Sequence, residues 1–395
     1  MKIGILTFHS QINYGGVLQC MALQQALEDL GHEVQVIDLW MHPYCEGLDG
    51  VFAKGMRIRR RIRLIVQSLL WPRMMARQLR HWRTRQFVNR NLHLTSYHFV
   101  DWKDAPRDLG VDLVVVGSDQ VWHCGDFGDP RPYLLEGAPK VKAIAYAASF
   151  GIREYPTGMI DVFREGFKRF SAISVRESSG IPLVEAAGGR AVHVVDPTVL
   201  IDSEFWQRLS PRKRVRSQGV PQRIVCYFIR QDIEDVLPLM ERFGRQHCCR
   251  FDIITTQLKP HLGTRAKFLN YCRFLLGFCP HVHLRAAVGP AEFLELFANA
   301  DASITDSFHA LMFSSIYDVN CRVLAPKGEY LKGMFARLQE FASCVDGPLI
   351  VQDFCEALDS LGRGEVVRFG KNPISIMRKN SMEWLRRAIS LTERT

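Results

Sequence analysis

Four successive apolar runs in the first half of the chain each end in polar residues, and this repetition constrains the fold more than any other feature. The runs cover residues 111–116, 143–148, 172–175 and 192–195. Short apolar runs of this kind predict buried strands of a parallel sheet. The polar groups that follow them are, in order, Gly117-Ser118-Asp119, Ser149, Arg176-Glu177 and Asp196. Because the carboxyl ends of parallel strands meet at one edge, we expect these groups to share a ligand cleft.

The start of the chain predicts the opening of a doubly wound α/β domain. A strand over residues 2–7 leads through Asn13-Tyr14-Gly15-Gly16 into a helix over residues 17–30, and a second strand follows over residues 34–38. The glycine spacing is not that of a dinucleotide site. Glycines in such a turn either admit a ligand or only allow tight packing, and both interpretations stay open.

A histidine in the second half of the chain is the leading candidate for proton transfer. The apolar run 302–305 breaks at Asp306-Ser307 and continues as a helical pattern that begins with Phe308 and His309. A residue in the first turn of a helix lies beside free N–H groups and the positive end of the helix dipole. Histidine also titrates near neutral pH. The alternative is that Asp306 or Ser307 only caps the helix and His309 packs nearby.

These patterns predict two Rossmann-like α/β domains that face each other across a central cleft, in a GT-B-like arrangement. A length of 395 residues suits two domains. We assign residues 1–205 to the first domain and residues 221–372 to the second, with a polar linker over residues 202–222. An amphipathic helix over residues 373–395 is expected to cross back to the first domain.

The net charge of +10 is concentrated in residues 54–90, which carry 12 Lys and Arg residues and no acid. The remaining chain has 39 basic and 41 acidic residues. Apolar residues at helical spacing, interrupted by Pro72, predict a basic helical hairpin here. It either contacts an anionic membrane, with Trp71 and Trp82 among the headgroups, or packs on its own domain. Nucleic acid is not an expected partner, because no reading module accompanies the cations.

The cysteines and the apolar content favour a cytoplasmic protein. Eleven cysteines are scattered without a C-x-x-C pair, which predicts reduced thiols and no metal site. Met1-Lys2 leads directly into the first strand, unlike a signal peptide. No apolar run approaches the roughly 20 residues that span a bilayer.

Several of these segments, taken together, resemble the polysaccharide pyruvyl transferase family and occur in its order. The matching segments are Asn13-Tyr14-Gly15-Gly16-Val17-Leu18-Gln19, Val116-Gly117-Ser118-Asp119-Gln120-Val121-Trp122, Ala147-Ala148-Ser149-Phe150-Gly151, Ser174-Val175-Arg176-Glu177, Asp196-Pro197-Thr198 and Thr305-Asp306-Ser307-Phe308-His309. The resemblance implies an enzyme that moves the enolpyruvyl unit of phosphoenolpyruvate onto two hydroxyls of a sugar. The products are a cyclic pyruvate ketal and phosphate, and no cofactor is implied.

The resemblance also implies roles for single residues. His309 matches the proposed general acid, and Arg176 matches an arginine that binds the donor. Some members carry Arg-Leu-His where this chain has Ser307-Phe308-His309, so we expect Ser307 at the donor and Arg337 to supply the missing charge. Asp119 or Asp306 would take the proton of the sugar hydroxyl. The acceptor is expected against the first domain, at Asn13, Tyr14, Gly15, Gly16, Gly117, Ser118, Gln120 and Trp122.

The expected acceptor is a polyprenyl-diphosphate-linked or nucleotide-linked sugar of a cell-surface polysaccharide precursor. A lipid-linked acceptor would give residues 54–90 a purpose, because they would hold the enzyme at the inner face of the cytoplasmic membrane. Two alternatives stay open. One is a GT-B glycosyltransferase with a nucleotide-sugar donor, whose ribose would meet Glu292 or Glu295 and Asp306. The other is a non-catalytic relative that binds a glycan.

Overall fold

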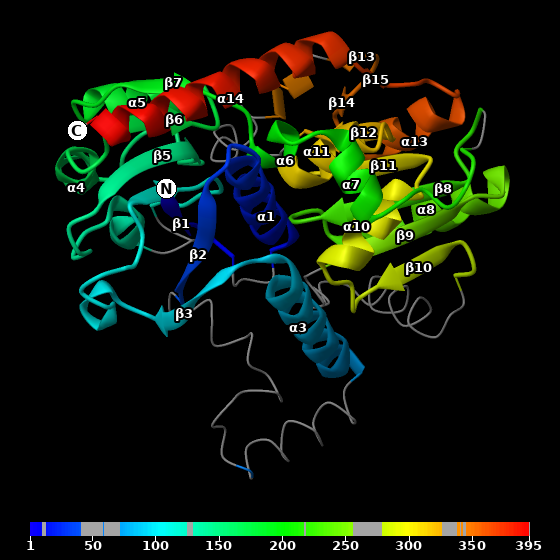
Figure 1. Cartoon of the computed structure of the whole chain (residues 1–395). Coiled ribbons are helices and arrows are strands. Elements are labelled where there is room, and N and C mark those ends of the chain that lie inside the picture. Colours follow the sequence, from blue (N-terminus) through cyan, green and yellow to red (C-terminus); the bar gives the residue numbers. More distant parts are fainter. Residues whose placement is uncertain are drawn as a thin grey trace.

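The protein has two parallel-sheet α/β domains that lie side by side (Figure 1). The computed structural model describes residues 1–9, 13–40, 58, 72–124, 129–216, 219–255, 279–325, 338–339, 341–342 and 345–394. The predicted α/β class with two Rossmann-like domains is therefore confirmed. Arg337 lies outside the described residues. So do residues 54–71 of the predicted basic hairpin, with the exception of Ile58.

The first sheet has seven parallel strands and carries the polar strand ends that the sequence singled out. In spatial order they are β3 (Leu94–Phe99), β2 (Glu33–Leu39), β1 (Lys2–Leu6), β4 (Leu113–Val116), β5 (Lys142–Ala148), β6 (Ala172–Val175) and β7 (Ala191–His193). The four apolar runs thus form the adjacent strands β4 to β7. The order reverses between β1 and β4, where Ile3 pairs with Leu113. Such a reversal opens a crevice at the carboxyl ends of the strands.

Helices cover both faces of this sheet. The helices α1 (Tyr14–Asp29) and α14 (Lys371–Arg394) contribute to the core on one face. The helices α4 (Met159–Phe167) and α5 (Gly180–Ala186) pack on the other face with the short 3-10 helices η2 (Trp102–Asp104) and η3 (Arg131–Leu134). Side chains alternate between the two faces, so Val115 points to the first core and Val116 to the second.

The second sheet repeats this arrangement with six parallel strands. They are ordered β10 (Val282–Arg285), β9 (Arg250–Thr255), β8 (Arg223–Phe228), β11 (Ala302–Thr305), β12 (Asn320–Leu324) and β14 (Ile350–Val351). A small antiparallel pair, β13 (Val345–Asp346) and β15 (Arg368–Phe369), stands apart from it. The helices α10 (Pro290–Ala298) and α11 (Phe308–Ile316) pack on one face, and α8 (Ile233–His247) and α13 (Phe354–Gly362) on the other. Here the strand order reverses between β8 and β11, which opens a second crevice at the carboxyl ends of these strands. The helix α11 follows β11 and therefore starts at this crevice.

The connection between the domains is partly helical, which the polar composition of residues 202–222 did not indicate. Two short helices, α6 (Pro197–Leu200) and α7 (Ser203–Leu209), follow β7. The Asp202 carboxylate accepts a hydrogen bond from the N–H of Phe205 and so caps α7. Trp206 is completely buried, and its ring centroid lies 5.0 Å from that of Phe313 on α11. The connection is thereby anchored to the helix that carries His309.

Tyr14, a predicted acceptor residue, instead joins the two domains. Its hydroxyl donates a 3.0 Å hydrogen bond to the carbonyl of Val288. Its ring stacks on Phe293 of α10, with centroids 4.9 Å apart, and is 1% exposed. Burial raises the pKa of the Tyr14 hydroxyl to about 12, so this group stays a neutral donor. A ligand cannot reach this ring without separating the domains.

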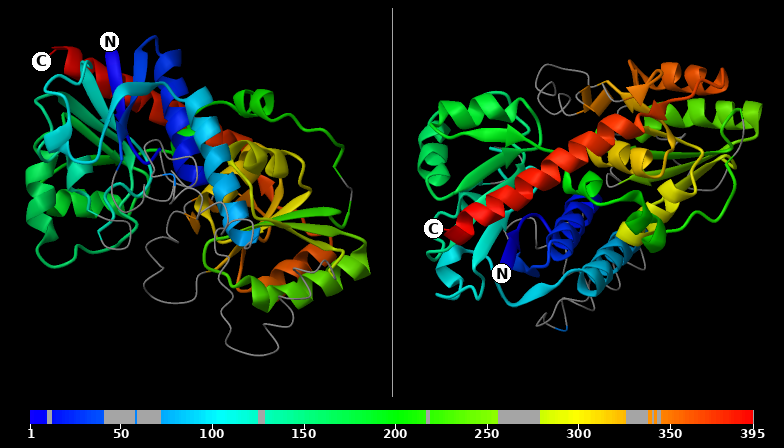
Figure 2. Two further views of the ribbon diagram at one scale, coloured as in Figure 1. Left: turned by 90° about the horizontal axis from the view of Figure 1, so that it is seen from below. Right: turned by 45° about the horizontal axis from the view of Figure 1, so that its top comes forward.

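The helix α3 (Pro72–Asn91) lies against the second domain (Figure 2). Its arginines make this contact. Arg80 is 3% exposed and donates two hydrogen bonds to the carbonyl of Ala286. Arg83 donates one to the carbonyl of Ala287. Some cations of residues 54–90 therefore fix one domain against the other. None of the described helices is long and apolar enough to cross a membrane.

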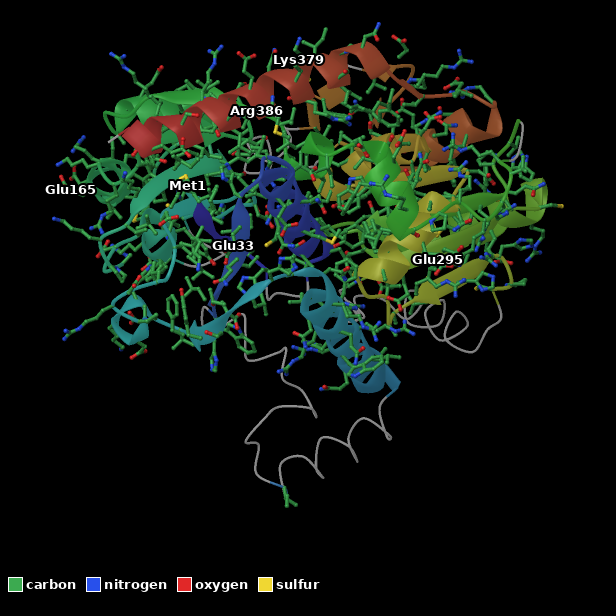
Figure 3. All side chains as sticks on the ribbon, in the orientation of Figure 1. Met1, Glu33, Glu165, Glu295, Lys379 and Arg386 are labelled. Carbon is green, nitrogen blue, oxygen red and sulfur yellow. The ribbon has the colours of Figure 1, made fainter. Side chains whose placement is uncertain are left out.

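The long C-terminal helix α14 lies across the first domain (Figures 1 and 2). The Ser381 hydroxyl accepts a hydrogen bond from the N–H of Val195, and Arg378 donates one to the carbonyl of Val199. Leu385 is completely buried in the core. Lys379 and Arg386 occupy the outer side of the helix (Figure 3). Both chain ends thus lie on the first domain.

We expect Leu385→Ala to lower the free energy of unfolding by about 2–5 kcal/mol, because it leaves a cavity in a closed core. Denaturant unfolding followed by circular dichroism measures this change. The matched control is Leu391→Ala on the same helix, since Leu391 is 55% exposed. It should change stability by less than about 0.5 kcal/mol. Equal effects of the two substitutions would contradict the packing of α14 described above.

Candidate active site

A buried arginine between two carboxylates lies at the centre of the candidate site. Arg176 follows β6, and its Nη1 lies 2.9 Å from Oδ2 of Asp196. Its Nη2 lies 3.6 Å from Oδ1 of Asp119, which follows β4. The Ser118 hydroxyl accepts a 3.3 Å hydrogen bond from Arg176 and donates a 3.1 Å hydrogen bond to Asp196. The ends of β4, β6 and β7 therefore converge, as the polar residues after these strands predicted.

Asp196 is held as a buried anion. Its Oδ1 accepts hydrogen bonds from the N–H and the hydroxyl of Thr198. Burial by itself would raise the pKa of Asp196. The contact with His309, the charge of Arg176 and the N–H of Thr198 outweigh burial, and together they hold this pKa well below its usual range. Asp196 therefore keeps its negative charge beside His309 at every working pH.

His309 reaches the same cluster from the second domain. Its Nε2 lies 3.6 Å from Oδ2 of Asp196. Its ring rests on Gly15, where a β-carbon would come within 2.0 Å of Nδ1. Only glycine leaves room for the imidazole at this point. Gly15 therefore allows the close approach of α1 and α11, and this is the tight packing that one of the two interpretations of this turn expects.

Asp119, which follows β4, lies against the same first turn of α1, beside Gly16. Its backbone has φ of 81°, a left-handed conformation that Asp tolerates better than most residues. Its carboxylate accepts hydrogen bonds from Asn13 Nδ2 and from the N–H of Gln120, at 3.1 and 2.9 Å. A β-carbon on Gly16 would lie 3.1 Å from its Oδ2. Gly15 and Gly16 thus bring His309 and Asp119 against the first turn of α1.

Two helix N-termini meet at this cluster, and neither has a side-chain cap. Asn13 and Ser307 hold the cap positions of α1 and α11, and neither side chain bonds the first turn. Within the described residues, Nε and Nη2 of Arg176 and Nε2 of His309 are buried without a hydrogen-bond partner. Uncapped N-termini, together with buried side-chain nitrogens that have no hydrogen-bond partner, favour an anionic ligand.

Phe308 closes the site in this conformation. Its ring lies over the guanidinium of Arg176, with Cζ 5.1 Å from the ring centroid. The side chain of Arg176 is 0% exposed and that of His309 is 10% exposed. His309 is therefore the more accessible of the two side chains. A ligand reaches Arg176 only when the Phe308 ring moves aside.

Several predicted acceptor residues serve the core of the first domain. Trp122 is completely buried, with its centroid 5.1 Å from that of Phe167 and 5.3 Å from that of Phe150. A β-carbon on Gly117 would lie 2.8 Å from a methyl group of Leu23, so Gly117 allows close packing. The structure thus places Trp122 and Gly117 inside the domain.

Gln120 and Glu177 shape the loop that follows β5. Gly151 has a left-handed φ of 64°, and a β-carbon there would come within 2.1 Å of Gln120 Nε2. The Glu177 carboxylate accepts hydrogen bonds from the hydroxyl of Ser149 and from the N–H groups of Phe150 and Gly151. Arg176 therefore pairs with Asp196 and Asp119, while the adjacent Glu177 fixes a loop.

Asp306 holds a loop of the second domain. Its carboxylate accepts hydrogen bonds from the N–H groups of Ile229, Arg230 and Gln231, at 2.7, 2.8 and 3.1 Å. These bonds join the ends of β8 and β11 at the crevice. Ser307 is 2% exposed, and its N–H donates to the hydroxyl of Thr305. Arg337, the other predicted donor residue, lies outside the described residues.

Asp196 is the central residue that the predicted site omitted. It stands at the end of β7 just as Arg176 stands at the end of β6. The sequence does contain a signal for Asp196, because the polar residues after both strands are expected at the same edge of the sheet. Among the described residues, no group of three His, Cys, Asp or Glu side chains is arranged to hold a metal ion.

Comparison with known families identifies the chain. The family described as Polysaccharide pyruvyl transferase matches residues 13–328. The chain belongs to this family. The matched region contains the two glycines of α1, the Arg176–Asp196 pair and His309. The expected resemblance is therefore confirmed, and the protein is a pyruvyl transferase by family. No curated protein sequence matches the chain.

Two solved structures that share this fold are a UDP-GlcNAc 2-epimerase and a putative UDP-N-acetylglucosamine 2-epimerase. The UDP-GlcNAc 2-epimerase of Methanocaldococcus jannaschii is 14% identical, with a TM-score of 0.50, and the match covers 99% of this chain and 100% of that chain. A putative UDP-N-acetylglucosamine 2-epimerase from Listeria monocytogenes is 11% identical, with a TM-score of 0.51, over 98% of this chain and 95% of that chain. At such identities the likeness concerns the fold alone, and it confirms the GT-B-like arrangement of this pyruvyl transferase.

We expect Asp196→Asn to lower the free energy of unfolding at pH 7 by about 3–5 kcal/mol, because it leaves the buried charge of Arg176 unbalanced. The folded-state pKa of Asp196 is lowered, so its contribution to stability is complete above about pH 4 and is lost as the pH falls further. Denaturant unfolding of both proteins from pH 7 to pH 3 should therefore show a shrinking difference.

The control for this experiment is Glu165→Gln. Glu165 is an exposed carboxylate on α4 that pairs with Lys168 (Figure 3). This variant should unfold like the wild type across the whole range. A difference between wild type and Asp196→Asn that stays constant down to pH 3 would contradict the ionised, buried state of Asp196.

Proposed function

We propose that this pyruvyl transferase moves the enolpyruvyl group of phosphoenolpyruvate onto two hydroxyls of a sugar and releases phosphate. The observation that carries the proposal is the position of His309. It lies in the first turn of α11, on Gly15 of α1 and beside the ionised Asp196. An acid that is fixed between two uncapped helix N-termini suits an anionic donor that must be protonated.

The donor would bind through its negative charges. Phosphoenolpyruvate carries a phosphate and a carboxylate, and both suit helix N-termini without a side-chain cap, such as those of α1 and α11. His309 lies between these two helix starts. Arg176 would add its unused Nη2 donor once the Phe308 ring moves from above it. Ser307 and Arg337 remain proposed donor residues on the grounds of the family resemblance.

The proposed reaction requires one acid to protonate the donor and one base to accept the proton of a sugar hydroxyl. His309 would donate a proton to the methylene carbon of the donor, which leaves an oxocarbenium-like centre at C2. A sugar hydroxyl adds to C2 and gives its proton to a carboxylate, for which we propose Asp119. The second hydroxyl then displaces phosphate, which leaves with that hydroxyl's proton. Asp306 is the weaker choice of base, since its oxygens accept three backbone N–H groups.

The acceptor is proposed to be a sugar on a polyprenyl diphosphate or nucleotide carrier, at the first domain near Asn13 and Ser118. For a lipid carrier, residues 54–90 would provide contact with the inner face of the cytoplasmic membrane. Leu79 and Trp82 of α3 support this contact, because they are 37% and 40% exposed instead of being packed in the core. Exposed apolar residues among arginines are typical of a surface that meets anionic lipid.

A nucleotide-sugar donor is less well supported by the contacts of the second domain. Glu292 pairs with Arg83 and also accepts the N–H of Gly289. Glu295 pairs with Lys213. Together with Asp306, these carboxylates were the candidates for a ribose. Each already has partners of its own, and the three do not form one site.

Acceptor-dependent release of phosphate from phosphoenolpyruvate tests the proposal. The assay uses purified protein with a panel of lipid-linked and nucleotide-linked sugars. We expect His309→Ala to lower the rate about 10²–10⁴-fold, the usual contribution of a general acid. Release of a nucleoside diphosphate from a nucleotide sugar would indicate the alternative donor instead.

Gly15→Ala tests the position of His309, because it would displace the imidazole without removing it. The new methyl group would clash with the His309 ring, so the rate should fall to a similar extent. Adding Gly15→Ala to His309→Ala should then cost no further activity, because the two substitutions remove the same function. Full activity of Gly15→Ala, or additive losses, would contradict the proposed contact.

A further inference from the structure

One face of the second sheet carries charged side chains where a parallel sheet ordinarily carries apolar ones. Arg250 and Asp252 are two residues apart on β9 and so point to the same face. The register pairs Arg223 of β8 with Arg250, and His283 of β10 with Asp252. Arg285 follows His283 by two residues. Five charged or titratable side chains therefore share this face, on the side of the sheet that α10 covers.

A single buried carboxylate serves three arginines on this face. The side chain of Asp252 is 1% exposed. Its oxygens lie 2.7 Å from Arg285 Nη2, 3.0 Å from Arg250 Nη2 and 3.6 Å from Arg223 Nη2. Arginine keeps its charge in proteins, so this group has a surplus of positive charge.

The surplus affects the neighbouring titratable groups. Burial, and then the charge of Arg250, lowers the pKa of Arg223. Burial and the charges of Arg250 and Arg285 outweigh the carboxylate of Asp252 and lower the pKa of His283. Three arginines around one carboxylate give this face a net positive charge in spite of Asp252. Within the described residues, Nε of Arg250 is also buried without a hydrogen-bond partner.

A cavity of about 760 Å³ opens over this face between α3, the interdomain connection and α10. Arg83 and Glu292 pair with each other across its wall, as do Lys213 and Glu295. Glu295, which is labelled in Figure 3, lines the cavity from α10. The remaining cations that line it are Arg214, Arg223 and Arg285. Arg214 has no carboxylate partner among the described residues, and the charge of Asp252 is shared by three arginines.

We propose that this cavity is a second anion site, which binds a phosphate or diphosphate group through Arg214, Arg223 and Arg285. Three guanidinium groups around one cavity provide the paired donors that phosphate oxygens accept. The cavity is separate from the candidate active site, although Val288 lines the one and bonds to Tyr14 beside the other. The group bound here belongs to a nucleotide, a lipid diphosphate or a free phosphate compound.

Calorimetric titration of the full chain with inorganic pyrophosphate tests this site. We expect Arg214→Ala and Arg223→Gln each to weaken binding about 10-fold or more, the usual effect of losing a charged hydrogen bond. Arg190→Ala removes an exposed arginine before β7 and should leave binding unchanged. His309→Ala should also retain the binding at this cavity. Circular dichroism confirms that each variant is folded.

Two results would overturn the proposal. One is pyrophosphate binding that His309→Ala abolishes and Arg214→Ala leaves intact, since the only anion site would then be the active site. The other is the absence of any binding that depends on Arg214 or Arg223. These outcomes do not depend on the transfer reaction, so the second site and the proposed function can fail separately.

Competition identifies the source of the phosphate group once this binding is observed. Displacement of pyrophosphate by UDP indicates a nucleotide. Displacement by phosphatidylcholine vesicles that contain a polyprenyl diphosphate, but not by phosphatidylcholine alone, indicates a lipid carrier. Displacement by neither indicates a free phosphate compound. Each of these three results supports the site in the cavity.

Discussion

The buried ion pair of Arg176 and Asp196 is the interaction on which the rest of the site depends. Removing two charges from water is costly, and the cost is offset only when both charges have close partners. Here the partners come from the ends of β4, β6 and β7 and from α11. Any arrangement that moved one of these elements would leave a charge unbalanced. The pair therefore fixes the carboxyl ends of the first sheet and ties the second domain to them.

The contact between α1 and α11 gives this electrostatic centre a chemical use. Two consecutive glycines let the first turn of α1 come against both His309 and Asp119. His309 and Asp119 are thus held against one turn of α1, next to helix N-termini that favour an anion. Tyr14 bonds to Val288 of the second domain, and Trp206 of the connection packs on Phe313 of α11. The geometry of the site is in this sense a property of the interface between the domains.

The sequence predicted those features that depend on local pattern. Short apolar runs indicated β4 to β7, and the polar residues after them indicated the edge at which Arg176 and Asp119 meet. It could not predict contacts between distant segments. Trp122 and Tyr14 belong to the same motifs as Asp119 and Gly15, yet the tertiary packing buries both rings. The contact of α3 with the second domain through Arg80 is also a contact between distant segments. The sequence could not predict it, because a basic helix ordinarily faces solvent.

The central claim is that His309 delivers a proton to the methylene carbon of phosphoenolpyruvate. The most direct measurement is the mass of the pyruvate ketal formed in D₂O, because the proton on an imidazole nitrogen exchanges with solvent. The account predicts one deuterium in the methyl group of each transferred pyruvyl unit, and loss of this product in His309→Ala. A ketal without deuterium, or one that His309→Ala forms at the wild-type rate, would contradict the account.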